Sequence, residues 1–212
     1  MSLDHLHRSE PASWLMTLPD ALSRQIAARQ RIVHAARGVR IYGYGEQPGG
    51  IYRVMSGVVG AQSRDDDALI GHLLGPGSWF GESSALTRQP RVVATVAMTE
   101  TRLAYLPLQV IEEIGAFHPD LWRGLAALAA SNSAIAVQIT RDLMITRPEE
   151  RVSAVLRRLS HSLGREIPIP LSQEQLADMC VLSRGAVSRI LSRLESAGLV
   201  RRGYREIWWL ED

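Results

Sequence analysis

Leu-Ser-Arg-Gly-Ala-Val-Ser-Arg-Ile-Leu, residues 182–191, is the most informative stretch of this 212-residue chain. Ser183 is a favoured helix N-cap. Val187, Ile190 and Leu191 then recur at the spacing of one buried helix face. Arginine and serine occupy the remaining faces, so the helix offers hydrogen-bond donors to a partner. These features predict the second, groove-binding helix of a helix-turn-helix motif.

The sequence on either side completes a winged helix-turn-helix. Ser172 is a suitable N-cap for a first, short helix, and a turn separates it from the second helix at residues 184–197. Gly198 ends the second helix, and residues 199–201 and 207–210 predict a β-hairpin, the wing. In this arrangement the second helix fits the DNA major groove.

Positive charge is concentrated in this motif. Residues 184–205 hold six arginines and one acid, whereas residues 1–146 hold 13 arginines and 13 acidic residues. Because a guanidinium can bond the two acceptors of guanine or a phosphate, double-stranded DNA is the predicted partner. The predicted DNA-contacting residues are Ser172, Gln173, Ser183, Arg184, Gly185, Ser188, Arg189, Arg193, Arg201 and Arg202. Arg205 adds attraction for the phosphate backbone.

The N-terminal half predicts a helical segment followed by an antiparallel β-roll. Residues 12–36 are expected to be helical and to end at Gly38. The apolar face of this segment consists of Leu15, Leu18, Leu22 and Ile26. Residues 39–106 contain short apolar runs separated by glycine-rich turns, which is typical of an antiparallel sandwich or barrel. Asp65–Asp67 mark a solvated hairpin tip.

Residues 120–146 predict one long helix, and Pro148 marks its end. Its apolar stripe steps by four, three, four, three and four positions, as in a coiled coil, with Asn132 as a polar residue that fixes register. One small β-domain cannot cover a helix of about 40 Å, so a second copy of the chain is the predicted partner. The alternative is a helix packed along its own β-roll. The predicted dimer interface is Leu121, Leu125, Leu128, Asn132, Ile135 and Ile139.

The predicted fold class is α+β, in three parts. Residues 1–119 form the helical segment and β-roll, residues 120–147 the dimerisation helix and hinge, and residues 148–212 the winged helix-turn-helix. No apolar stretch reaches the roughly 18 residues that span a bilayer, so no membrane partner is expected. The single cysteine, Cys180, excludes a disulfide framework or a four-cysteine cluster and favours the cytoplasm. Its place on the inner face of the first helix predicts a buried, inert thiol rather than a redox switch.

The chain resembles the family of the cyclic-AMP receptor protein and the fumarate–nitrate reduction regulator (CRP/FNR) over residues 38–210. The resemblance is carried by residues 182–191, by Gly-Pro-Gly-Ser-Trp-Phe-Gly-Glu at 75–82, and by His118-Pro119-Asp120. It implies a homodimeric bacterial transcription regulator, joined along the long helices. It also implies a pseudo-palindromic operator, with half-sites about 34 Å apart, and RNA polymerase as a further partner.

Two departures from the family pattern concern DNA. Family members commonly carry a glutamate where this chain has Gly185, and that glutamate accepts a hydrogen bond from cytosine. The turn between the two helices usually carries glycine where this chain has Val181. The loss of an acceptor at position 185 implies an altered operator.

A third departure concerns the effector. The family's cyclic-nucleotide site corresponds to Gly81, Glu82, Ser83, Ser84, Arg91, Val92, Ala136 and Val137. An ungapped alignment puts Val92 where the phosphate-binding arginine belongs, whereas a shorter turn leaves Arg91 near the pocket. Ala136 and Val137 replace hydroxyls that contact the base, and neither side chain can donate a hydrogen bond. Cyclic AMP is therefore disfavoured, and Gly81 with Glu82 is interpreted as preserving a turn of the β-roll.

The leading functional hypothesis is a sequence-specific transcription regulator whose effector is either not cyclic AMP or absent. A cyclic-nucleotide-dependent activator is the first alternative. A ligand-sensing module that docks a protein partner is the second, and the excess of arginine argues against it. No nucleophile–base pair or phosphate-binding loop is present, so no enzyme is expected. The six histidines show no ligand spacing, so no metal site is predicted, although composition does not exclude haem.

Overall fold

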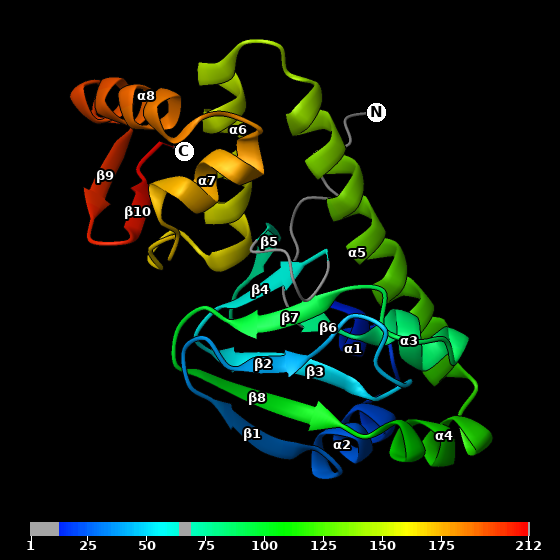
Figure 1. The fold of residues 1–212 in the computed structure, drawn as a ribbon. Coiled ribbons are helices and arrows are strands. Elements are labelled where there is room, and N and C mark those ends of the chain that lie inside the picture. Colours follow the sequence, from blue (N-terminus) through cyan, green and yellow to red (C-terminus); the bar gives the residue numbers. More distant parts are fainter. Residues whose placement is uncertain (1–12, 64–68, 212) are drawn as a thin grey trace.

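The protein was analysed as a computed structural model that describes residues 13–63 and 69–211 (Figure 1). Two short N-terminal helices and a β-roll form one end of the molecule, and a long helix leads from them to a C-terminal winged helix-turn-helix (Figure 1). The predicted hairpin tip at Asp65–Asp67 lies outside the described residues. Among the residues described, no helix is long and apolar enough to cross a membrane.

The N-terminal segment is helical only in part. Helices α1 (Ser13–Met16) and α2 (Asp20–Ala28) are joined by a turn that contains Leu18. Leu18, together with Leu22 and Ile26 of α2, is buried, so three of the four residues predicted for the apolar face are in the core. The prediction of helix up to residue 36 is wrong, because Arg31–Ala35 forms strand β1 and pairs antiparallel with β8. The β-branched pair Ile32–Val33 suits a strand, and the ladder with β8 satisfies the backbone of β1.

The β-roll consists of two four-stranded antiparallel sheets, ordered β1-β8-β3-β6 and β2-β7-β4-β5. The strands are β2 (Arg40–Tyr42), β3 (Ile51–Ser56), β4 (Val59–Gln62), β5 (Ile70–Leu74), β6 (Trp79–Phe80), β7 (Ala94–Ala97) and β8 (Thr101–Leu106). A core of Tyr42, Val54, Val59, Leu74, Phe80 and Leu103 fills the space between the sheets. Each predicted apolar run between 51 and 106 therefore contains a strand.

The long helix α5 (Asp120–Met144) follows the shorter helices α3 (Glu82–Thr87) and α4 (Leu108–Phe117). Leu121, Leu125 and Leu128 are buried in a cluster with α1, α2 and α4, so their assignment to a dimer interface is wrong. The Asn132 side-chain amide donates to the Trp79 carbonyl at 3.2 Å, so Asn132 also faces its own β-roll. The heptad spacing correctly predicted an apolar face on α5, but the spacing does not reveal whether that face packs on the same chain or on a second copy.

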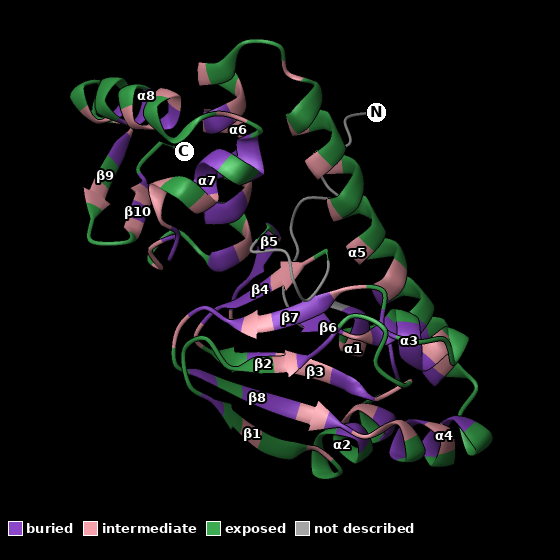
Figure 2. Cartoon of the chain, viewed as in Figure 1, coloured by how far each residue is buried: buried purple, intermediate pink, exposed green. Residues whose placement is uncertain are grey.

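The second half of α5 is mostly exposed or half-buried (Figure 2). Ile135 and Ile139, the last two predicted interface residues, are half-buried in this single chain. The alternative, a helix packed along its own β-roll, therefore describes the first half of α5. Among the residues described, the second half keeps mostly exposed or half-buried side chains.

The C-terminal unit contains α6 (Pro148–Leu163), α7 (Gln173–Cys180), α8 (Arg184–Ser196), β9 (Val200–Gly203) and β10 (Glu206–Trp209). Its core continues into the β-roll, because Val58, Ile70, Leu73 and Met98 belong to the same buried cluster as α6, α7 and α8. A Cβ atom at Gly75 would lie 2.6 Å from the Leu163 Cα, so only glycine permits this approach. The winged helix-turn-helix is thus packed directly on the β-roll of its own chain.

Candidate nucleic-acid interface

Local hydrogen bonds fix both helices of the helix-turn-helix. The Ser172 hydroxyl accepts from the Gln175 backbone at 3.1 Å, and the Gln175 side chain accepts from the Ser172 backbone at 2.9 Å, which completes a capping box. The Ser183 hydroxyl accepts from the Ala186 amide at 3.2 Å and caps α8. Cys180 is buried, as predicted, and burial raises the pKa of its thiol to about 12.

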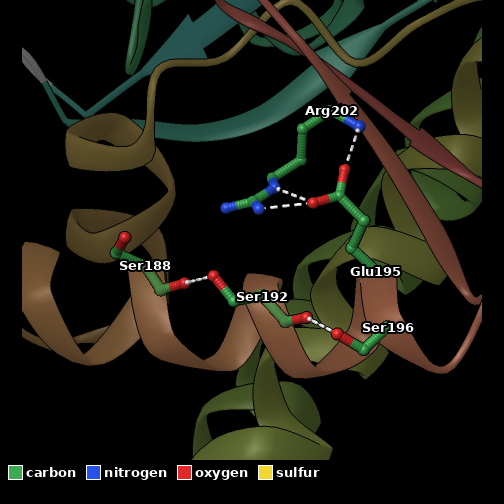
Figure 3. A network of polar contacts seen from close by, with 5 residues as sticks. All are labelled: Ser188, Ser192, Glu195, Ser196 and Arg202. Atoms are coloured by element: carbon green, nitrogen blue, oxygen red, sulfur yellow. Dashed lines mark hydrogen bonds and ion pairs between the residues drawn. The ribbon is translucent and has the colours of Figure 1, made fainter.

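Helix α8 separates an apolar face from a polar face as the sequence predicts. Val187, Ile190, Leu191 and Leu194 are buried. Arg184, Gly185 and Arg189 are exposed, and Ser188 is half-buried. Farther along the polar face, the Ser192 and Ser196 hydroxyls donate to carbonyls one turn back, at 3.0 and 2.9 Å (Figure 3). The side chains of α8 that can donate hydrogen bonds to DNA therefore lie in the N-terminal half of the helix.

Three of the predicted DNA-contacting arginines bind groups within the protein. Arg193 donates to Glu149 of α6, with Nε at 2.9 Å and Nη2 at 2.7 Å. Arg202 binds Glu195 through its side chain and its backbone (Figure 3). The Arg201 guanidinium lies 4.3 Å from the Trp208 ring centroid, across the hairpin. Neither Glu149 nor Glu195 was predicted, because each meets its arginine only through the tertiary fold.

A groove of about 470 Å³ lies between the start of α7, the start of α8 and the wing. It brings together Ser172, Gln173, Arg184 and Arg202 of the predicted set. Tyr204, at the hairpin turn, also lines the groove; it was not predicted to contact DNA, although an aromatic residue beside a turn glycine was a usable signal. Three arginines and two glutamates line this groove, which opens beside the start of α8.

Arg91 occupies the centre of the predicted effector pocket. Its Nη1 donates to the Gly81 carbonyl and its Nη2 to the Gly50 carbonyl, both at 2.8 Å. The guanidinium also lies 4.2 Å from the Tyr42 ring centroid. The shorter-turn alternative is therefore correct, and the assignment of Val92 to the pocket is wrong, since Val92 is 62% exposed. A Cβ atom at Gly49 would lie 2.6 Å from Arg91 Nη2, so the guanidinium fills this cradle.

The other predicted pocket residues are divided between buried and exposed positions. Burial raises the pKa of the Glu82 carboxyl, and a hydrogen bond with Asn132 of α5 opposes that rise. The Ser84 hydroxyl donates to the Gln89 carbonyl at 2.7 Å. Ser83, Ala136 and Val137 are exposed in the single chain. The Arg91 and Ser84 side chains are thus hydrogen-bonded to backbone carbonyls of the protein, and Glu82 is buried.

A buried polar cluster joins the β-roll to the C-terminal unit. Arg158 of α6 donates from Nη1 to His72 Nδ1 at 2.8 Å and from Nε to Asp142 of α5 at 2.6 Å. The Ser162 hydroxyl donates to the Leu73 carbonyl at 2.8 Å and contacts His72 Nε2 at 3.2 Å. Because the hydroxyl proton is used on Leu73, we assign the neutral tautomer with the proton on His72 Nε2. Burial, and then Arg158, lower the pKa of His72 to about 3.

Family comparisons agree with both halves of the molecule. Residues 32–116 match the family model for the cyclic nucleotide-binding domain, and residues 150–211 match that for the Crp-like helix-turn-helix domain. The chain belongs to the CRP/FNR family of transcription regulators. The resemblance and the α+β fold class inferred from the sequence are therefore confirmed, and the family is one of regulators, not enzymes.

Individual relatives cover most of the chain. The transcriptional regulator SdrP of Thermus thermophilus is 29% identical over 76% of this chain and 79% of its own length. A CRP-like cAMP-activated global transcriptional regulator of Mycobacterium tuberculosis is 25% identical over 85% of this chain and 83% of its own. The structure of FixK2 from Bradyrhizobium japonicum superposes with a TM-score of 0.72 at 24% identity, covering 86% of this chain and 93% of that one. The last comparison supports the fold.

Proposed function

We propose that this CRP/FNR-family regulator is a cytoplasmic homodimer that binds a pseudo-palindromic operator without a cyclic nucleotide. The observation that carries the proposal is the N-terminal half of α8, where Arg184 and Arg189 are exposed and make no hydrogen bond, ion pair or ring contact with the residues described. Their guanidinium groups suit guanine edges in the major groove. Because Gly185 supplies no carboxylate, we expect a half-site without the cytosine contact common in the family.

The dimer is supported by the uncovered face of α5. Ala127, Ala130, Ala134 and Val137 are exposed and recur at steps of three, four and three residues. Small side chains allow two helices to approach closely, and the spacing is that of a coiled coil. We therefore move the proposed interface from the buried stripe to this face, which is called the alanine face below.

Independence from cyclic nucleotides is supported by the cradle around Arg91. A cyclic phosphate would need the Arg91 guanidinium, which is bound to two backbone carbonyls, and the ribose would need Glu82, which is bound to Asn132. Both groups would have to leave partners in the protein before a ligand could use them. We propose RNA polymerase as the regulator's further partner, through the function that defines the family.

The test is selection of bound duplexes from a random pool by the purified protein, with and without a mixture of cyclic nucleotides. A two-fold-symmetric site enriched without nucleotide supports the proposal, and a site enriched only with nucleotide contradicts its effector-free part. Arg189→Ala should weaken binding to the selected site by about 1–3 kcal/mol per half-site and relax one base preference. Arg157→Ala, which removes the same charge from another surface of the C-terminal unit, is the matched control.

A further inference from the structure

The six arginines of residues 184–205 fall into two classes in the structure. Arg193, Arg201 and Arg202 contact Glu149, Trp208 and Glu195 respectively. Arg184, Arg189 and Arg205 are exposed and make no hydrogen bond, ion pair or ring contact with the part of the chain that the structure describes. The free cations therefore lie at the start of α8 and at the tip of the wing, whereas the bound ones lie between them.

The Glu195–Arg202 pair ties the wing to the helix that reads DNA. Glu195 stands in the last turn of α8 and Arg202 in β9, seven residues later. One carboxylate oxygen accepts from the Arg202 backbone at 3.1 Å, and the other accepts from Nε at 2.8 Å and from Nη2 (Figure 3). These contacts lower the pKa of the Glu195 carboxyl, so the pair stays ionised at neutral pH.

The wing is held by the Glu195–Arg202 pair and by a second contact on its other strand. Ile207 of β10 is opposite Arg202 in the hairpin, and its backbone exchanges two hydrogen bonds with Ile169, at 2.8 and 3.0 Å. The tip beyond these contacts is Tyr204, 90% exposed, and Arg205, which has a left-handed φ of 58°. No packing explains an exposed tyrosine there, and both tip residues line the groove beside Arg184.

We propose that Glu195 is a positioning residue for DNA binding. It keeps the Arg202 guanidinium bound within the protein, away from DNA phosphates, and it orients the wing so that Arg205 makes the wing's phosphate contact. The proposal rests on the DNA-binding function of this family. Arg202 also lines the groove, so its release from Glu195 would place a new cation where DNA passes. Loss of Glu195 should thus add a phosphate contact from Arg202 and strengthen non-specific binding. The Ile169–Ile207 hydrogen bonds still keep Arg205 near the backbone, so the lost restraint should lower the preference for the operator rather than remove the Arg205 contact.

Salt dependence separates these roles, because each phosphate neutralised contributes about 0.9 to the slope of log affinity against log salt. Binding of the full-length protein to a random-sequence duplex is measured from low to moderate salt. Per bound subunit, Arg205→Ala should reduce the slope by about 0.9, and Arg202→Ala should leave it unchanged. Glu195→Ala should increase the slope by about 0.9, and the double variant Glu195→Ala/Arg202→Ala should return it to the wild-type value.

Two further variants test whether a change in slope at Glu195 comes from the net charge of the protein or from disturbed folding, and not from the positioning role. Glu211→Ala breaks the Arg157–Glu211 pair, which does not line the groove, and should leave the slope unchanged despite the same charge difference. Glu195→Gln keeps an acceptor for the Arg202 backbone, so it should raise the slope and preserve more preference for the selected operator than Glu195→Ala.

The outcomes are distinct. A slope reduced by Arg202→Ala as much as by Arg205→Ala would overturn the proposal, as would a folded Glu195→Ala protein with the wild-type slope. Wild-type protein that binds no duplex would overturn it together with the DNA-binding function.

Discussion

At the scale of single residues, Val181 has an unfavourable backbone conformation in the turn of the helix-turn-helix. It ends α7 with φ 53° and ψ 51°, and its side chain is 71% exposed. A β-branched residue in this left-handed conformation costs about 1–2 kcal/mol, and exposure leaves little packing to offset that cost. The structure thus explains why a glycine suits this turn.

Val181→Gly should therefore increase the free energy of unfolding, by about 0.5–1 kcal/mol, because glycine's larger unfolded-state entropy offsets part of the relief. Urea denaturation of the two proteins measures the difference. Val39→Gly is the control, since Val39 is also exposed but does not have a positive φ, and this change should lower stability. A loss of stability in Val181→Gly would show that the valine side chain has a contact that outweighs its strain.

At the scale of elements, α5 carries two stripes on different faces. The stripe that begins at Leu121 is covered by its own chain, and the alanine face is uncovered. Glutamates at Ala130 and Ala134 would place four carboxylates in a close helix pair, so the double variant should be monomeric in light scattering at micromolar concentration. Ala136→Glu, exposed and on the opposite side of the helix, should remain dimeric. A dimer that survives the double variant would move the interface off α5.

The helices and strands also show which parts of the fold could be predicted from the sequence alone. Glycine-rich turns and alternation predicted the strands between 51 and 106, and caps at Ser172 and Ser183 predicted both DNA-binding helices. Strand β1 was missed because it directly follows a helix and mixes polar with apolar residues. The partners of Arg202 and Arg91 were missed because a carboxylate across a turn, or carbonyls from distant loops, leave no periodic signal.

At the scale of the whole molecule, the cluster of His72, Arg158 and Asp142 holds the DNA-binding unit on the β-roll. The Arg158 and Asp142 side chains are only 8% and 14% exposed, so their pairing is weakly screened by salt. The arginine reaches the β-roll through His72 and the long helix through Asp142. A continuous apolar core lies at the same junction, so packing and the polar cluster together hold the winged helix-turn-helix against the β-roll.

The cluster also makes stability depend on pH in a defined direction. His72 has a folded-state pKa of about 3, below the ordinary value of 6.5, so it accepts a proton more readily in the unfolded chain. Stability from this group is complete above about pH 6.5 and is lost as the pH falls towards 3. Between pH 7 and pH 5 we expect a loss of about 1–2 kcal/mol in the free energy of unfolding. His72→Asn, which keeps an acceptor for Arg158 but does not titrate, should remove that component, whereas His34→Asn at an exposed site should not. Denaturation curves at both pH values give the comparison, and an acid loss in His72→Asn equal to the wild-type loss would assign the pH dependence to other groups.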